Sequence, residues 1–74
     1  MKRAEEKEWI YEFSRRLKER MEYLEMSQTE LAKRSGVPQS SISQYVNGRK
    51  KPSAYVIPKL AKALVCSVAD LIDF

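Results

Sequence analysis

Residues 28–47, QTELAKRSGVPQSSISQYVN, decide the fold, because their turn-forming residues mark two short helices with very little chain between them. Ser27 precedes the stretch and Glu30 follows three residues later, the spacing at which serine and glutamate each bond a free backbone amide at a helix start. Gly36 suits the end of that helix, since a residue without Cβ adopts a left-handed backbone at little cost. Pro38 suits the start of the next helix, where its missing N–H would be unbonded anyway. The stretch therefore predicts two helices that meet at a sharp corner of about three residues.

The chain on both sides of this stretch also has helical periodicity. A long amphipathic helix is predicted over about residues 5–24, whose apolar positions are Trp9, Ile10, Phe13, Leu17, Met21 and Leu24. After the stretch, Ser53 can cap a helix that Pro58 makes irregular until about residue 57. Ser67 and Asp70 can cap a short fifth helix. No segment alternates with period two for long enough to be a strand, so we expect an all-α fold of five helices in one domain, residues 1–74.

Composition excludes several classes of function. With 74 residues, 43% hydrophobic and 32% charged, the chain can close only one modest core. It has one cysteine and no histidine, so we expect no disulfide, no metal and no cofactor. No credible set of general acid, base and nucleophile is present either, so an enzyme is not expected. The sequence shows no small-molecule ligand site.

The sequence also predicts the compartment. No apolar run approaches the roughly 18 residues of a membrane span. The start, MKRAEE, lacks the apolar centre of a signal peptide. We therefore expect a cytoplasmic protein with no membrane partner.

The net charge of +4 is unevenly distributed. Residues 1–26 hold seven Lys or Arg and seven Glu, so this third is neutral. Residues 27–62 hold seven Lys or Arg against the single acid Glu30. Such a basic middle is expected of a chain that meets a polyanion such as nucleic acid, although solvated surface lysines give the same composition.

Residues 28–47 resemble the helix-turn-helix unit of the lambda-repressor-like family, which includes the phage repressors and Cro proteins. In that pattern an alanine lets the two helices approach, a glycine makes the turn, and apolar residues fill the interface. The matching residues are Leu31, Ala32, Gly36, Val37 and Ile42. The resemblance covers about residues 13–73 and leaves about residues 1–12 as an N-terminal helical extension. It implies a five-helix lambda-repressor-like DNA-binding domain in a bacterial or phage-encoded protein associated with the nucleoid.

The second helix of this unit has one polar side. With Ile42, Tyr45 and Val46 facing the core, the residues facing outward are Gln39, Ser40, Ser43, Gln44 and Asn47. Glutamine donates and accepts together, which matches the edge that adenine shows in the major groove. The resemblance places base-reading positions at Gln39, Ser40 and Gln44, with Ser43 beside them. A plain solvated face is the alternative interpretation.

Cations follow this helix directly. Arg49, Lys50 and Lys51 are predicted to bind DNA phosphates. The resemblance assigns phosphate contacts to Arg49, Asn47 and Gln28, and Gln28 can also brace the reading glutamine. The alternative for each lysine is ordinary solubility. Because no Lys or Arg lies on the base-reading side itself, we expect contacts to A·T pairs more than to guanine, unless Arg49 enters a groove.

Three positions depart from the family pattern. Many members pair an arginine seven residues before the first glutamine of the unit with an acid near the end of the reading helix, but here these positions are Met21 and Val46. Replacing both ions of a buried pair by packed apolar side chains is often neutral or better, so we expect Met21 and Val46 to touch. Val65 stands where the family usually has glycine just beyond the fourth helix. A β-branched residue disfavours the left-handed backbone, so we expect this helix to end with a different geometry.

The residues outside the family pattern raise the question of self-association. Trp9 and Ile10 can pack on the C-terminal residues of the same chain, which we favour, or be buried by a second subunit. A homodimer is expected on DNA, because two units related by a two-fold axis read half-sites about one DNA turn apart. The predicted dimer surface is the C-terminal helix, through Leu71, Ile72 and Phe74.

These features predict a sequence-specific DNA-binding transcriptional regulator, most simply a repressor that binds an inverted-repeat operator in double-stranded DNA as a dimer. The alternative is a protein-interaction module of the same fold, which binds a toxin, a polymerase subunit or another regulator. Its anchors would be Trp9, Ile10 and Phe74, and its basic charge would be incidental. Salt separates the two, because DNA binding weakens with a slope of about −0.9 per phosphate contact.

Overall fold

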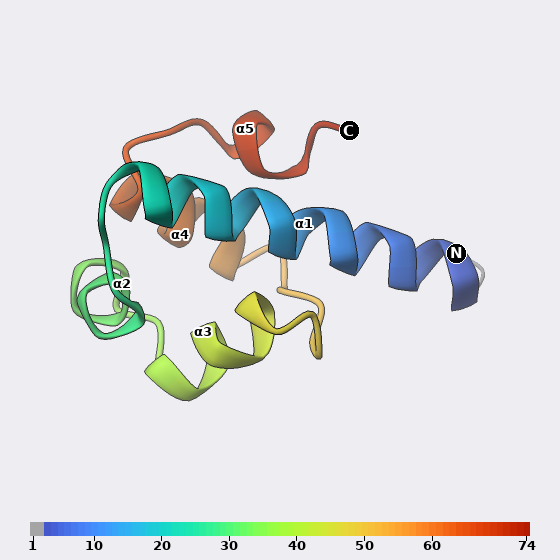
Figure 1. Ribbon diagram of the computed structural model, residues 1–74, viewed down its shortest axis with the longest axis horizontal. Coiled ribbons are helices and arrows are strands. Elements are labelled where there is room, and N and C mark those ends of the chain that lie inside the picture. The colour runs from blue at the N-terminus through green and yellow to red at the C-terminus, as the bar shows by residue number, and fades with distance from the viewer. Residues whose placement is uncertain (1–2) are drawn as a thin grey trace.

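The computed structural model describes residues 3–74, with side chains from residue 5 onward, and these residues form five helices and no strand (Figure 1). The helices are α1 (Arg3–Tyr23), α2 (Gln28–Ser35), α3 (Gln39–Val46), α4 (Val56–Ala63) and α5 (Val68–Ile72). The predicted all-α class and the order of its helices are confirmed. Among the described residues, no helix is both long enough and apolar enough to cross a membrane.

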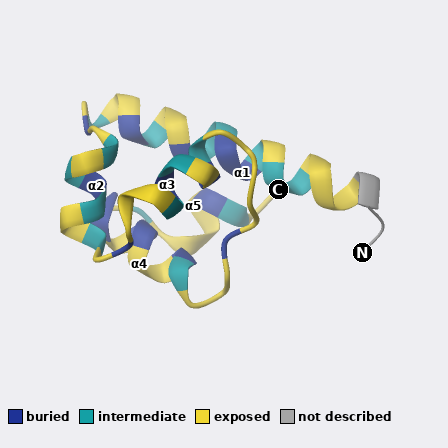
Figure 2. Cartoon of the chain, turned by 90° about the horizontal axis from the view of Figure 1, so that it is seen from below, coloured by how far each residue is buried: buried dark blue, intermediate teal, exposed yellow. Residues whose placement is uncertain are grey.

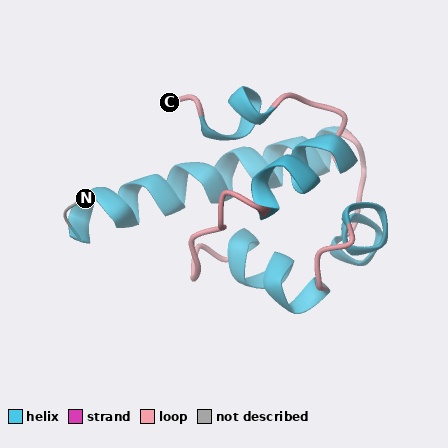
Figure 3. Cartoon of the chain, turned by 180° about the vertical axis from the view of Figure 1, so that it is seen from behind, coloured by secondary structure: helices cyan, strands magenta, loops and turns pink. Residues whose placement is uncertain are grey.

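The long helix α1 organises the other four. It runs along the length of the molecule, with α5 on one side and α2 and α3 on the other (Figure 1), while the view from behind shows α4 on the face that Figure 1 hides (Figure 3). Direct packing joins α1 to α3 and α5, α2 to α3 and α4, and α4 to α5. The largest fully buried side chains come from all five helices or their immediate ends: Phe13, Leu17, Leu31, Ile42, Leu60, Leu64 and Leu71. One cluster of apolar side chains therefore fixes the position of α3.

The corner between α2 and α3 follows the sequence prediction closely. The Ser27 hydroxyl accepts a hydrogen bond from the Glu30 N–H at 3.1 Å, which caps α2. The Glu30 carboxylate accepts a hydrogen bond from Arg34 at 3.2 Å, so only the serine half of the predicted reciprocal pair forms. Gly36 ends the helix with φ of 76°. Pro38 is the residue before α3 and not its first residue, so the predicted corner is shifted by one position to residues 36–38. The corner keeps its length of about three residues.

Ser67 caps α5 as predicted, whereas the residue before α4 is Tyr55, which makes no capping hydrogen bond, so Ser53 supports only the turn that precedes α4. The Ser53 hydroxyl accepts a hydrogen bond from the Val56 N–H at 3.3 Å, after which α4 becomes regular. Pro58 then falls in the first turn of α4, where a missing N–H removes no intrahelical bond. At the start of α5, Ser67 and Asp70 form a reciprocal capping box with distances of 2.9 and 3.1 Å. The hydrogen bonds from the Ser67 N–H and hydroxyl lower the pKa of the Asp70 carboxyl.

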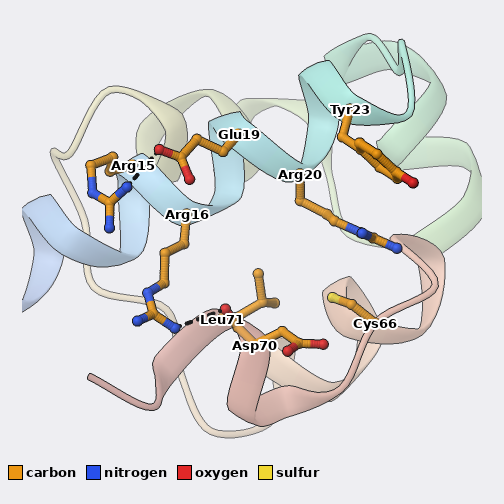
Figure 4. A pocket seen from close by; sticks show the side chains of 8 residues that line it. All are labelled: Arg15, Arg16, Glu19, Arg20, Tyr23, Cys66, Asp70 and Leu71. Carbon is orange, nitrogen blue, oxygen red and sulfur yellow. Dashed lines mark hydrogen bonds and ion pairs between the residues drawn. The ribbon is translucent and has the colours of Figure 1, made fainter.

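Arginines on α1 tie the C-terminal third of the chain to the long helix. Arg20 donates from Nε to the Leu64 carbonyl and from Nη2 to the Val65 carbonyl, both at 2.9 Å. Arg16 donates to the Asp70 carbonyl at 3.1 Å (Figure 4). The two Arg20 bonds satisfy carbonyls just beyond the end of α4, and the Arg16 bond satisfies one in the short helix α5. Nearby, Arg15 pairs with glutamates of its own helix. The hollow between these arginines and Cys66 is therefore bordered by groups that already hold the fold together.

The end of α4 turns through the left-handed backbone that suits glycine, although Val65 gave reason to expect a different helix end. Val65 adopts φ of 53°, and the N–H groups of Val65 and Cys66 donate to the carbonyls of Lys62 and Ala61. This is the double hydrogen bond of a helix end that turns through the left-handed region. A β-branched residue is thus held in a conformation that suits glycine, and its side chain is 70% exposed.

Val65→Gly is expected to stabilise the fold by about 1 kcal/mol. Removing the strain of a left-handed L-residue stabilises the folded state by about 1 to 2 kcal/mol. The extra conformational entropy of glycine in the unfolded chain offsets about half of that gain. The exposed valine leaves no cavity when it is removed. Thermal denaturation should show a melting temperature about 4 to 8 °C above that of the parent. Val65→Ala keeps the left-handed strain, so its melting temperature should rise less. A Val65→Gly variant that melts at or below the temperature of the parent contradicts the argument.

Candidate nucleic-acid interface

The outer face of α3 is polar and open to solvent. Ile42 and Tyr45 are buried on the inner side of the helix, with 0% and 4% of their surface exposed. The outer face consists of Gln39, Ser40 and Gln44, which are exposed, and Ser43, which is half-buried beside them. Figure 2 shows exposed residues along α3. The structure therefore brings the four predicted base-reading residues together on one side of one helix. Uncharged donors and acceptors of this kind are suited to hydrogen bonding with base edges.

Three contacts hold α3 in place behind this face. Ile42 lies in the apolar core, and the Tyr45 ring meets the Phe13 ring of α1 edge to face, with centroids 6.4 Å apart. The Ser14 hydroxyl donates a hydrogen bond of 2.6 Å to the carbonyl of Val46 at the end of α3. Ser14 is itself buried, so this bond is shielded from water. A helix fixed to α1 in this way can present its outer face in one orientation.

Gln39 is braced from α2, although not by the residue that the sequence indicated. The Thr29 hydroxyl donates to Oε1 of Gln39 at 3.3 Å, across the corner between the two helices. This bond uses the carbonyl end of the glutamine side chain and leaves its amide nitrogen to donate elsewhere. Gln28, the predicted brace, is half-buried at the first position of α2. Thr29 was missed because only the tertiary corner, and no motif, places it opposite Gln39.

The end of α3 leads directly into the basic loop, which we define as Arg49, Lys50 and Lys51. Asn47 donates from Nδ2 to the Ser43 carbonyl at 2.9 Å, so this predicted phosphate ligand closes its own helix. The Arg49 N–H donates to the Gln44 carbonyl at 2.9 Å, which ties the loop to the helix. All three side chains of the basic loop are exposed. The loop therefore places positive charge next to the outer face of α3.

The other cations of residues 27–62 differ in their contacts. Arg34 pairs with Glu30, and the Lys59 ammonium lies 4.3 Å from the ring centroid of Tyr55. Lys33 and Lys62 are exposed. Arg34, Lys59 and Lys62 line one hollow between α2 and α4 and not the outer face of α3.

The predicted dimer residues divide between core and surface. Leu71 is only 1% exposed and belongs to the core of its own chain, which removes it from any surface that a partner could contact. Ile72 is half-buried and Phe74 is 49% exposed. Trp9 stacks on Phe13 and lies 5.6 Å from Phe74 between ring centroids, so the favoured packing of the extension on its own C-terminus is confirmed for Trp9.

The described residues do not place metal ligands together. Within residues 3–74, no group of three or more His, Cys, Asp or Glu side chains could hold a metal ion. Burial raises the pKa of the Cys66 thiol, which favours its protonated form. Cys66 thus behaves as a small half-buried side chain beside the arginines of α1.

Comparison with known proteins agrees with this geometry. A helix-turn-helix family model matches residues 17–71. The match contains α2, α3 and the corner between them, and it leaves out the first 14 residues of α1 (residues 3–16) and the last three residues of the chain. No curated protein and no solved structure gives a significant match.

Proposed function

Because the chain belongs to the Cro/C1-type helix-turn-helix family, it is a DNA-binding regulator and not an enzyme, and we propose that it represses transcription by binding an inverted-repeat operator as a homodimer. The observation that carries the sequence-specific part of this proposal is the outer face of α3. Its four polar side chains lie on a helix that buried contacts hold to α1. A fixed polar helix of this kind fits the major groove, where base pairs present distinct patterns of donors and acceptors.

The residues of the outer face favour A·T base pairs. Gln39 and Gln44 can each accept from the adenine amino group and donate to the adjacent ring nitrogen. Because Thr29 already holds the carbonyl end of Gln39, this side chain loses less conformational entropy when it binds DNA. The hydroxyls of Ser40 and Ser43 adapt to either strand of the duplex. Arginine, the usual partner of guanine, is absent from this face and present only in the basic loop.

Phosphate contacts come from the flanks of α3. The basic loop follows the helix, and Gln28 and Asn47 stand at the start of α2 and the end of α3. In this proposal, the basic loop and the two polar side chains position the helix along the groove without reading sequence. Asn47 would keep its bond to Ser43 and approach the phosphate at the helix end.

A second subunit is needed because one unit of this size contacts few base pairs. Two copies related by a two-fold axis read half-sites about one turn of DNA apart, which increases affinity and specificity together. Of the three predicted dimer residues, the half-buried Ile72 and the exposed Phe74 remain available to a second copy. The dimer surface that we propose is therefore this region without Leu71.

Selection of binding sites tests the proposal. The parent protein should enrich an inverted repeat from a random duplex library at near-physiological salt. Gln39→Ala and Gln44→Ala should each relax base preference at a separate position of the half-site, by about 1 to 3 kcal/mol of discrimination. Lys50→Ala is the matched control, because losing a phosphate contact weakens all sequences about equally. Enrichment of no sequence, or unchanged preferences in both glutamine variants, contradicts sequence reading by α3.

Repression itself is tested in cells. A promoter that overlaps the selected site should lose reporter expression when the parent is produced, and the two glutamine variants together should restore it. Increased expression from the same promoter would make the protein an activator.

A further inference from the structure

A series of aromatic rings joins both ends of the chain to α3. Trp9 stacks on Phe13 with centroids 5.5 Å apart and planes 8° from parallel, and Phe74 lies on another side of Trp9. Phe13 in turn meets Tyr45 of α3. Trp9, Phe13 and Phe74 all lie outside residues 17–71, the segment that matches the family. This arrangement is therefore an addition to the shared helix-turn-helix unit.

The same tryptophan also contacts the basic loop. The Lys51 ammonium lies 5.2 Å from the centroid of the Trp9 ring, within the distance at which an aromatic face attracts a cation. Pro52, the next residue, is buried. At its other end, the loop is tied to α3 by the hydrogen bond from the Arg49 N–H to the Gln44 carbonyl. The basic loop is thus held at one end by the proposed reading helix and at the other by the N-terminal extension.

We propose that Trp9 is a positioning residue for DNA binding, which holds Lys51 beside α3 so that its ammonium meets a DNA phosphate. The inference rests on the proposed function, since it concerns how that same surface meets DNA. A free lysine side chain loses rotamer freedom when it binds, and a ring that already confines it removes part of that cost. An aromatic face does this without neutralising the charge, whereas a carboxylate would compete with the phosphate.

A double-mutant cycle on the selected duplex tests whether Trp9 acts through Lys51. Trp9→Leu keeps an apolar side chain on α1 and should weaken DNA binding about two- to fivefold, the range that corresponds to an exposed cation–ring contact. Lys51→Ala should weaken it as well. The two changes together should be no worse than Lys51→Ala alone, because the ring has no ammonium left to position.

The adjacent cation provides the matched control. Lys50 is exposed and precedes Lys51 in the same loop. In the Lys50→Ala background, Trp9→Leu should weaken DNA binding by the same factor as in the parent. The free-energy effects of Trp9→Leu and Lys50→Ala should therefore add. Trp9→Phe keeps an aromatic face and should bind within about twofold of the parent. All affinities are compared at a temperature where thermal denaturation shows each variant to be folded.

Two further measurements separate positioning from a general structural role. The dependence of affinity on salt should have the same slope in Trp9→Leu as in the parent, because the number of phosphate contacts is unchanged. Since Trp9 is the one tryptophan of the chain, Lys51→Ala should also change the fluorescence of the free protein while Lys50→Ala should not.

The outcomes distinguish this inference from the proposed function. Two results would contradict the positioning role and leave the proposed function standing. In the first, the parent binds DNA and Trp9→Leu binds as tightly. In the second, Trp9→Leu weakens binding as much in the Lys51→Ala background as in the parent. If the parent binds no duplex at all, both are wrong.

Discussion

Met21→Arg is expected to lower the free energy of unfolding by about 3 to 5 kcal/mol, because it places an unpaired cation in an apolar site. Met21 is 7% exposed and belongs to the core cluster, against which Val46 also packs. The two residues line one hollow between α1 and the end of α3. Glu22 and Glu25 also line it, but α3 itself contains no acid that could pair with the cation. Chains of this length have a margin of only about 3 to 5 kcal/mol, so most of the variant should be unfolded. Circular dichroism during thermal and urea denaturation measures this directly.

Two companion variants identify the cause of that loss. Met21→Leu keeps the volume and apolar character of the site and should cost less than about 1.5 kcal/mol. Met21→Arg combined with Val46→Glu should recover most of the lost stability, because it supplies the acid that other family members pair with this arginine. The direct contact between Met21 and Val46 remains a prediction. Recovery of stability in the double variant would support it. A single Met21→Arg variant as stable as the parent contradicts the argument.

The helices could be predicted because the signals that define them are local. Ser27, Gly36 and Ser67 act within three or four residues of their own positions. Gly36 and Ser67 end and start their helices as predicted, and Ser27 caps α2 without the reciprocal bond from Glu30. Helical periodicity across residues 5–24 likewise predicted α1 within about two residues at its ends. Val65 shows the limit of local reasoning. Its side chain disfavours the left-handed backbone, yet the hydrogen bonds at the end of α4 and the Arg20 hydrogen bond to its carbonyl hold it there.

The finer geometry of the interface depends on contacts between distant residues and could not be predicted. The sequence indicated that the outer face of α3 is polar, since helical spacing alone separates its two sides. It did not indicate that Thr29 reaches Gln39, or that Lys51 lies over Trp9, because both contacts require the corner and the loop to be folded first. The burial of Leu71 was missed for the same reason. Its position at the C-terminus favoured a surface role, whereas α5 folds back onto α1 and α4.

The affinity of the homodimer for its operator is expected to fall about a thousandfold between 50 and 200 mM salt. The basic loop supplies three exposed cations to each protomer, so two protomers make about six phosphate contacts and release the corresponding counterions. The slope of log affinity against log salt should then be about −5. Fluorescence anisotropy with a labelled duplex measures it. Lys50→Ala removes one contact from each protomer and should reduce the slope by about 2.

The same titration tests the protein-interaction alternative, because burial of apolar side chains hardly responds to salt of this concentration. A slope near zero, with affinity unchanged by Lys50→Ala, would contradict DNA binding through the basic loop. The structure already limits that alternative: two of its three predicted anchors, Trp9 and Phe74, pack against each other. A protein partner would have to contact Phe74 in place or displace it from Trp9. A steep slope together with a selected inverted repeat would leave the basic loop and the outer face of α3 as the surface that meets DNA.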